Sequence, residues 1–239
     1  MKFLDFSHKD RQKYSLLFNL LVIWLEIIGF IILLLSAHRI PFEYFTVDSN
    51  LLAFITSIIF VVYIMRGLEI PHWLRILKYV STACLAITFL VVIFVLAPMY
   101  NMNYGFLLFH NELLYQHFLC PIFYILTFLI FDNFMPDSDS KVSTRKNLRD
   151  LPLKIRWFRD RSYNYTYEIT SSDDKYVVLS VILYGVIMII LNLTDIVSGP
   201  YPFLRVKDQP VFASILWFIG IISSSYLVTI CLRKFRKSE

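Results

Sequence analysis

A threonine and a histidine in this sequence have the side-chain types and positions needed for nucleophilic catalysis. Thr46 lies in the segment FTVDSN at Phe45–Asn50, and His117 lies in QHFLCP at Gln116–Pro121. A hydroxyl group attacks an acyl carbon when a neighbouring base accepts its proton, and imidazole is the side chain that most often acts as that base. Each segment opens a long apolar stretch, so the path of the chain decides whether the two side chains can meet.

The composition is that of an integral membrane protein. Hydrophobic residues make up 57% of the 239 residues, and charged residues make up 17%, below the ~25% that is usual in soluble domains. Six apolar stretches are long enough, or nearly so, to cross a hydrocarbon core of ~30 Å as helices. These stretches are 14–37, 45–65, 76–98, 113–134, 176–193 and 211–232. We therefore predict an all-α six-transmembrane-helix bundle that forms a single domain over residues 1–239, with a basic loop at 135–175.

The positions of Lys and Arg predict the orientation of this bundle. Of the 23 Lys and Arg residues, we assign 20 to the two tails, to the loop between the second and third stretches, or to loop 135–175, and Lys78 at the start of the third stretch is counted with the loop before it. The other loops contain Arg39, Arg205 and Lys207. The positive-inside rule then places both termini in the cytoplasm, and Thr46 and His117 near the outer surface. We expect the plasma membrane as the location. The net charge of +5 follows from this bias and from attraction to anionic lipids, so we expect no nucleic-acid partner.

The cysteines argue against a disulfide framework and a zinc site, and the first apolar stretch argues against a cleaved signal peptide. Cys84, Cys120 and Cys231 lie in or beside apolar stretches, are odd in number and have no CxxC spacing. They predict neither a disulfide framework nor a zinc site, and no other pattern calls for a metal or a cofactor. The first stretch is longer than a signal-peptide core and lacks a small-residue cleavage site, so we expect it to stay as an anchor.

The polar residues that open the second stretch have a structural interpretation and a functional one. Ser, Thr, Asp and Asn all cap helix N-termini, and capping is a sufficient explanation for Asp48 and Ser49. Thr46 and Asn50 lie one helical turn apart, on a stripe that continues through Ala53 and Ser57 and should face the bundle interior. In a catalyst, the Asn50 amide or the first amides of this helix would stabilise an oxyanion.

His117 is the candidate base in the fourth stretch. A polar group at this depth is costly unless it faces the interior of the bundle. Pro121 lies four residues later, so the His117 carbonyl loses its usual helical partner and the helix should kink beside the imidazole. The alternative is a histidine that is hydrogen-bonded for structure alone. His110, in the preceding loop, is a second candidate that we expect to be solvent-exposed.

Glu26 is a separate candidate, near the middle of the first stretch. An ionisable residue at the centre of a bilayer suggests a functional site. It is equally compatible with a protonated carboxyl group that is hydrogen-bonded to a neighbouring helix. Both interpretations stay open at the level of sequence.

These motifs resemble those of the androgen-induced protein family of six-span membrane threonine hydrolases, and in particular its bacterial six-span relatives. The resemblance rests on F-T-x-x-S-N at Phe45–Asn50, on the histidine ahead of a proline at His117 and Pro121, and on GPYPFL at Gly199–Leu204. It extends over nearly the whole chain through the six-span layout, and loop 135–175 departs from the family pattern. The resemblance implies hydrolysis of fatty-acid esters of hydroxy fatty acids, with Thr46 as the nucleophile and His117 as the base.

We therefore interpret the chain as a hydrolase that cleaves lipophilic acyl esters within the membrane through a Thr46–His117 pair. Asn50 would support the oxyanion, and Glu26, Asp48 and His110 are secondary candidates. The rival hypothesis is a non-enzymatic protein, organised around Glu26, that binds or transports lipids or small molecules. The two hypotheses differ in whether Thr46 and His117 come within hydrogen-bonding reach. The sequence leaves the oligomeric state undetermined.

Overall fold

A computed structural model describes residues 8–132 and 169–237. The described part of the chain is helical, and six of its helices are long and apolar enough to cross a membrane: Asp10–Ala37, Phe45–Met65, His72–Met99, Asn111–Phe131, Ser171–Leu193 and Val211–Arg236. The predicted six-helix fold is confirmed. The predicted bounds of the second span hold at both ends. The first and third spans begin earlier than predicted, and the fifth begins at Ser171, so part of the predicted loop 135–175 is helical. The rest of that loop lies outside the described residues.

The first three spans are built from four helices and one wider turn. They comprise α1 (His8–Ala37), α2 (Phe45–Met65), α3 (His72–Val91), the π-helical turn η1 (Val92–Leu96) and α4 (Ala97–Met99). A short helix, α5 (Tyr104–Phe109), follows in the loop before the fourth span. The Asn103 side chain accepts a hydrogen bond from the Phe106 amide at 3.1 Å and so caps the start of α5.

The fourth span is not a regular α-helix. It consists of α6 (Asn111–Leu113), η2 (Leu114–Leu119), α7 (Cys120–Leu126) and η3 (Thr127–Phe131), of which η2 and η3 are π-helical. Because Pro121 has no amide hydrogen, the preceding turn widens, and the Cys120 amide bonds the carbonyl of Tyr115 five residues earlier. The irregularity predicted at His117 is therefore a π-helical turn.

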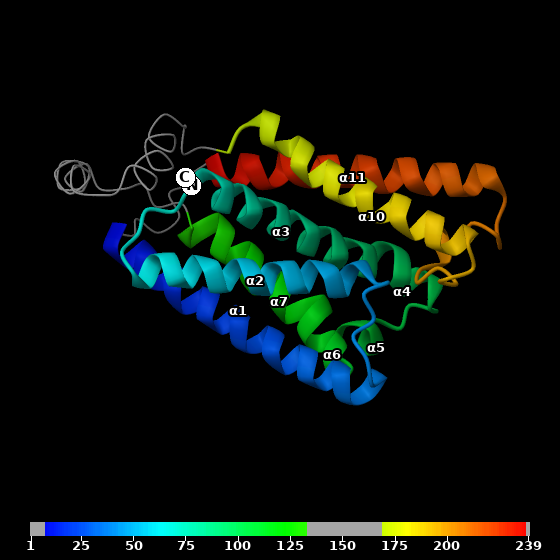
Figure 1. Ribbon diagram of the computed structural model, residues 1–239, viewed down its shortest axis with the longest axis horizontal. Coiled ribbons are helices and arrows are strands. Elements are labelled where there is room, and N and C mark those ends of the chain that lie inside the picture. Colours follow the sequence, from blue (N-terminus) through cyan, green and yellow to red (C-terminus); the bar gives the residue numbers. More distant parts are fainter. Residues whose placement is uncertain (1–7, 133–168, 238–239) are drawn as a thin grey trace.

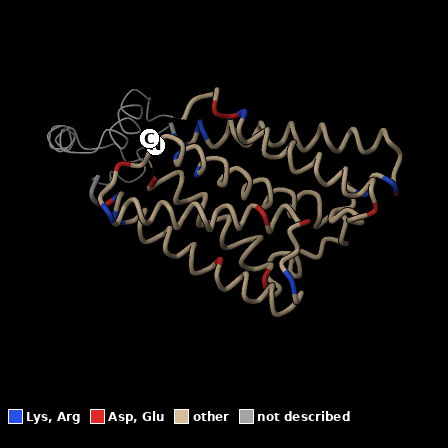
Figure 2. Tube along the Cα trace, in the orientation of Figure 1, with Lys and Arg blue, Asp and Glu red and all other residues tan. Residues whose placement is uncertain are grey.

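The last two spans close the bundle. They contain a 3₁₀ turn, η5 (Ser171–Asp173), followed by α10 (Asp174–Leu193), then the loop 194–210 with its own 3₁₀ turn, η6 (Pro202–Leu204), and then α11 (Val211–Lys237). We call residues 194–210 the outer loop, after the side of the membrane on which the charge pattern predicts them. Figure 1 shows α1 beginning and α11 ending at the same end of the bundle. Most of the described Lys and Arg residues gather at that end in Figure 2, as the charge pattern predicts.

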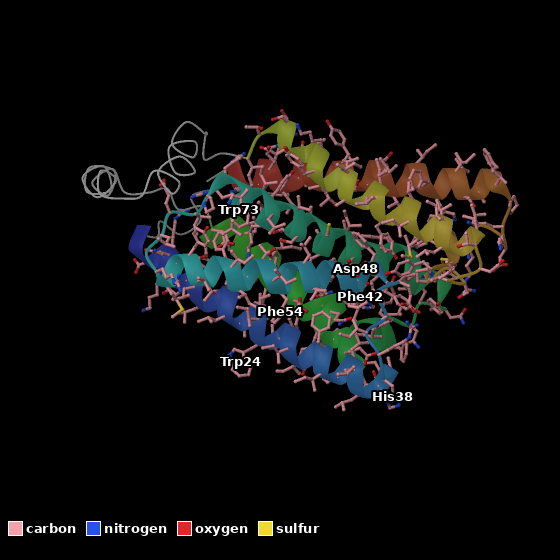
Figure 3. The ribbon with its side chains drawn as sticks, viewed as in Figure 1. Trp24, His38, Phe42, Asp48, Phe54 and Trp73 are labelled. Carbon is pink, nitrogen blue, oxygen red and sulfur yellow. The ribbon has the colours of Figure 1, made fainter. Side chains whose placement is uncertain are left out.

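Helix α3 is the central element. It packs against α2 and α7 on one side and against α10 and α11 on the other, whereas α1 lies at the edge of the bundle (Figure 1). The third span is 67% buried over its most apolar stretch, against 22% for the first span. Large apolar side chains cover the outer face of α1, and Trp24 projects from it away from the bundle in Figure 3.

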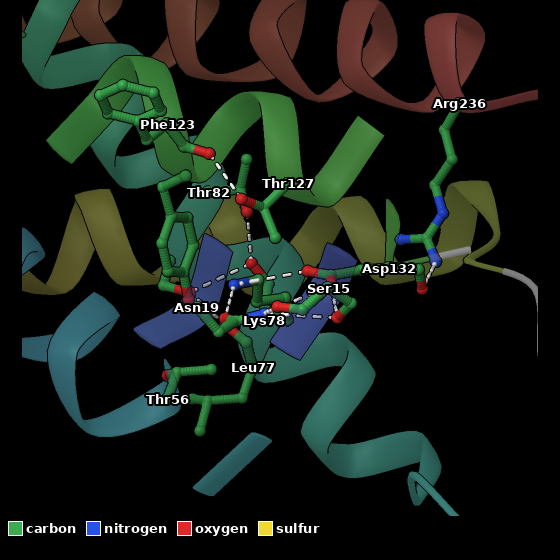
Figure 4. A network of polar contacts seen from close by, with 12 residues as sticks. Ser15, Asn19, Thr56, Leu77, Lys78, Thr82, Phe123, Thr127, Asp132 and Arg236 are labelled. Atoms are coloured by element: carbon green, nitrogen blue, oxygen red, sulfur yellow. Dashed lines mark hydrogen bonds and ion pairs between the residues drawn. The ribbon is translucent and has the colours of Figure 1, made fainter. Parts of the chain in front are cut away.

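Two adjacent residues of α3 join it to the two halves of the bundle. Lys78 donates a hydrogen bond to Asn19 Oδ1 at 2.6 Å and forms an ion pair with Asp132 at 3.4 Å, and Ser15 also donates to Asp132 (Figure 4). The side chain of Lys78 is almost fully buried. The charge pattern predicts Lys78 as a loop cation. This prediction is wrong, because Lys78 lies in α3 and its side chain points into the bundle.

Tyr79 makes the corresponding contacts on the opposite side of α3. Its hydroxyl group donates to Asp174 Oδ1 at 2.7 Å, and the same carboxylate forms an ion pair with Arg233 at 2.9 Å. These contacts bind α3 to α10 and α11. Consecutive helical residues point in different directions, so Lys78 and Tyr79 can serve the two halves separately.

Candidate functional site

The first turn of α2 is capped by tyrosine hydroxyl groups from elsewhere in the chain. The amide of Phe45 donates to the Tyr184 hydroxyl at 3.0 Å, and the amide of Thr46 donates to the Tyr201 hydroxyl at 3.3 Å. No side chain of the N-cap residue forms a capping bond at this helix. The expectation that Asp48 and Ser49 cap the helix is wrong, because the helix begins at Phe45 and both residues lie within it.

Tyr201 also contacts the side chain of the candidate nucleophile. Its hydroxyl group shares a hydrogen bond of 3.2 Å with Thr46 Oγ1, and both residues are buried. Burial raises the pKa of Tyr201 from 10.0 to about 12, and the hydrogen bonds with Thr46 partly oppose this rise. The phenol therefore stays protonated at neutral pH. It can hold the threonine hydroxyl in place, but it cannot accept its proton.

The outer loop is built to hold Tyr201 in this position. The Asn192 side chain bridges the loop, donating to the carbonyl of Val197 and accepting from the amide of Val206, both at 3.1 Å. Gly199 has φ +84°, and a Cβ atom there would lie 2.9 Å from the carbonyl oxygen of Leu204. Only glycine fits this close turn without strain.

Thr46 and Tyr201 lie on the wall of a small apolar cavity of about 50 Å³. The cavity is surrounded by α2, α3, α10, α11 and the outer loop, and its other walls are mainly aliphatic and aromatic side chains, including Phe203 and Phe218. Thr88 and Tyr184 also line it. A volume of this size admits a water-sized group, so a larger ligand requires the surrounding side chains to move.

His117 is buried in the π-helical turn η2 and faces α5. Its Nδ1 atom lies 2.7 Å from the carbonyl oxygen of Leu107. Because a carbonyl oxygen can only accept, Nδ1 carries the hydrogen of the neutral ring, which leaves the lone pair on Nε2. Nε2 makes no hydrogen bond to the described residues. The imidazole is therefore oriented as a hydrogen-bond acceptor through Nε2.

Thr46 and His117 are connected through the backbone and not through their side chains. The Asn50 side chain donates to the carbonyl of Thr46 at 2.7 Å and to the carbonyl of Gln116, the neighbour of His117, at 3.1 Å. No hydrogen bond joins Thr46 to His117 in the described structure, and neither His117 nor Asn50 lines the Thr46 cavity. Asn50 thus ties α2 to η2, and its amide hydrogens are already used.

The remaining candidates lie apart from this site. Asp48, labelled in Figure 3, is partly buried near the start of α2, and its side chain makes no hydrogen bond to the described residues. His110 is exposed and packs against the ring of Phe106. Glu26 is completely buried in α1, and neither of its carboxyl oxygens has an N–H or O–H hydrogen-bond donor among the described residues.

Tyr201 and Tyr184 are the residues at this site that our candidate set omitted. Both lie more than a hundred residues from Thr46 in sequence, with a separation of 155 residues for Tyr201. The sequence feature that could have indicated Tyr201 is the segment GPYPFL at Gly199–Leu204, which contains it. This segment contributed to the family resemblance but not to the set of candidate residues.

Comparisons with protein-family models, curated proteins and solved structures found no match for this chain.

Proposed function

We propose that this protein is an intramembrane hydrolase of lipophilic acyl esters, with Thr46 as its nucleophile. The observation that carries the proposal is the position of the Thr46 hydroxyl, which is buried at the wall of an apolar cavity and held by a protonated tyrosine. An ester with a long acyl chain suits such a cavity, because its carbonyl group can accept a hydrogen bond from a hydroxyl group at the wall while its acyl chain contacts the apolar side chains. Membrane lipids are the natural source of such esters.

His117 is the proposed base. The hydrogen bond from Nδ1 to Leu107 leaves Nε2 free to accept a proton. The reaction requires the two side chains to approach each other when an ester occupies the cavity, and catalytic hydrogen bonds often form only in the substrate complex. The π-helical turn that holds His117 is a type of irregularity frequently found at functional sites.

The proposed reaction has two stages. Nε2 of His117 removes the proton from Thr46 Oγ1, which attacks the ester carbonyl; the C–O bond to the alcohol breaks, and the imidazolium returns the proton to the leaving alcohol. Water then attacks the acyl-threonine with His117 again as the base, which releases the fatty acid and restores the hydroxyl group. The Tyr201 hydroxyl is placed to donate a hydrogen bond during both stages.

Hydrolysis of medium- and long-chain esters by the purified protein tests this proposal. Thr46→Ala and His117→Ala should each abolish turnover without unfolding the protein, and the double variant should be no slower than either single variant because the two residues act as one unit. Thr88→Ala is a matched control, since it removes another hydroxyl group that lines the same cavity. Full turnover in Thr46→Ala would overturn the proposal.

A second candidate function is lipid or small-molecule binding without chemistry, in a protein organised around Glu26. It is favoured by the observation that Thr46 is hydrogen-bonded to Tyr201 and not to His117. Retention of a photoreactive lipid by wild-type protein, with no hydrolysis of any ester tested, would support this candidate. For both functions the proposed location is the plasma membrane, with the basic end of the bundle in the cytoplasm.

A further inference from the structure

Glu26 places a carboxyl group in the interior of the bundle, near the middle of the first span. Its side chain is 0% exposed, and neither carboxyl oxygen reaches an N–H or O–H donor of the described residues. A charged carboxylate without partners is very costly in hydrocarbon, and ionisable residues at this depth commonly mark proton or ion pathways.

The surroundings of Glu26 contain further polar atoms without partners. The thiol of Cys120 in α7 lies against the carboxyl group. One turn before Cys120, Gln116 packs beside Gly29 of α1 and has a buried side-chain nitrogen without a hydrogen-bond partner. Asn50 bonds the carbonyl of Gln116, and its own side-chain oxygen is also buried and unpartnered. We call Glu26, Asn50, Gln116 and Cys120 the Glu26 cluster.

The cluster lacks a positive charge to balance a carboxylate. Lys78 is the buried lysine of the same half of the bundle, and it already bonds Asn19 and forms an ion pair with Asp132. Apart from the carboxyl group, the unpartnered polar atoms of the cluster are one oxygen, Asn50 Oδ1, and a side-chain N–H, and the thiol lies beside them. A hard cation takes about six oxygen ligands, which is more than this set provides. The described residues also contain no group of three or more His, Cys, Asp or Glu side chains able to hold a metal ion. The ligand that this environment suits is a proton.

We propose that Glu26 is a proton-binding site within the membrane. Its carboxyl group is a neutral acid at neutral pH, and its proton exchanges with water through the polar atoms of the Glu26 cluster. The titratable side chains that approach this region are Cys120 and Tyr115, with His117 next to Gln116 on the outer side. The site does not depend on the proposed ester hydrolysis, because neither Thr46 nor the apolar cavity takes part in it.

Infrared difference spectroscopy of the full chain in lipid bilayers at neutral pH tests the proposal. The wild-type spectrum should contain a carbonyl stretching band of a protonated carboxyl group that Glu26→Gln removes. In D₂O the band should move to lower frequency as O–H becomes O–D. Glu112→Gln is the control, since Glu112 lies in an exposed hydrogen bond with Ser36 and should not affect the band.

Two further variants keep the result interpretable. Cys120→Ser should shift the band, because a hydroxyl group is a stronger donor than the thiol beside the carboxyl. If Glu26→Gln does not fold, Glu26→Asp retains a carboxyl group and should show a displaced band in place of the wild-type one. Thr46→Ala should leave the band unchanged even if it abolishes hydrolysis. The band therefore tests the proton site, and hydrolysis tests the proposed enzyme activity, independently of each other.

The proposal is overturned if Glu26→Gln removes a carboxylate band instead of a protonated carboxyl band, because Glu26 is then ionised and balanced by a cation. It is also overturned if the protonated band keeps its frequency after prolonged incubation in D₂O, because the proton is then sealed in the bundle and the carboxyl group has only a structural role.

Discussion

At the scale of single residues, Thr46 differs from the other hydroxyl-bearing residues of α2 in its partners. Ser49 bonds the Thr46 carbonyl and Thr88, and Thr56 bonds the carbonyl of Leu52 in its own helix. Thr46 Oγ1 instead contacts Tyr201 from the outer loop and faces the apolar cavity. The environment that distinguishes Thr46 is therefore supplied by the loop and not by the helix that carries it.

Tyr201→Phe should weaken both the fold and the proposed activity. Loss of the hydroxyl group leaves the Thr46 amide and side chain without a partner, which should destabilise the protein by about 1–3 kcal/mol. Ester hydrolysis should fall roughly ten-fold, as expected when one hydrogen bond of about 1.4 kcal/mol is lost from the transition state. Unfolding in detergent and steady-state hydrolysis measure the two effects, with the exposed Tyr226→Phe as the control.

The dependence of stability on pH gives a second readout of the same variant. The folded protein holds the pKa of Tyr201 at about 12, above the reference value of 10.0, so the unfolded chain loses this proton first as pH rises. The resulting stability is complete below pH ~10 and is lost progressively between pH ~10 and ~12. Wild-type protein should lose more stability over this window than Tyr201→Phe. Equal losses of stability in the two proteins would show that the pKa of Tyr201 is not raised by the fold.

At the scale of elements, the sequence predicts the spans well and their irregularities poorly. The bounds of Phe45–Met65 follow from an apolar run between charged loops. The buried position of Lys78 could not be predicted from the sequence, because a lysine is usually exposed. Its burial is tolerated only because Asn19 and Asp132 approach it from other helices. Tyr201 could not be placed beside Thr46 for a similar reason, since that contact depends on the folded path of the outer loop.

The outer loop should be sensitive at Gly199. Gly199→Ala combines a positive φ angle with a clash at the Leu204 carbonyl, so we expect a destabilisation of about 1–3 kcal/mol and a loss of hydrolysis through displacement of Tyr201. Gly220→Ala is the matched control, because an added methyl group there meets no atom within 4 Å. Thermal unfolding and hydrolysis of the two variants give the comparison. Equal behaviour would mean that the loop does not hold Tyr201 rigidly.

In the whole molecule, α3 joins two halves of the bundle that differ in the polarity of their buried side chains. On one side, α1, α2 and the fourth span enclose Lys78, Glu26 and Asn50. On the other side, α10 and α11 enclose mainly apolar side chains around the ion pair of Asp174 and Arg233. The Thr46 cavity lies on the apolar side and the Glu26 cluster on the polar side, so the bundle can separate an ester site from a proton site.

Lys78→Met should test the role of α3 in joining the bundle. It removes the ammonium group that pairs with the buried Asp132 carboxylate, for which we expect a loss of about 3–5 kcal/mol. Adding Asp132→Asn should recover part of that loss. Lys207→Met breaks an exposed ion pair with Asp195 and should cost less than about 1 kcal/mol. Similar losses for the two lysines, measured by unfolding in detergent, would contradict a joining role for Lys78.

The orientation of the molecule can be tested independently. Single cysteines introduced at Lys207 and at Glu69 lie at opposite ends of the bundle, since one belongs to the outer loop and the other precedes α3. In intact cells, a membrane-impermeant thiol reagent should label position 207 and not position 69. Labelling in the reverse order would invert the orientation and place Thr46 and His117 near the cytoplasmic surface.

Covalent labelling with a long-chain fluorophosphonate is the direct test of whether Thr46 is a nucleophile. After reaction with purified protein and digestion, mass spectrometry should find the adduct on Thr46. Thr46→Ser should keep the label, Thr46→Ala should lose it, and His117→Ala should react more slowly because the base is absent. A label on another residue, or equal labelling of wild type and Thr46→Ala, would show that Thr46 is not the nucleophile.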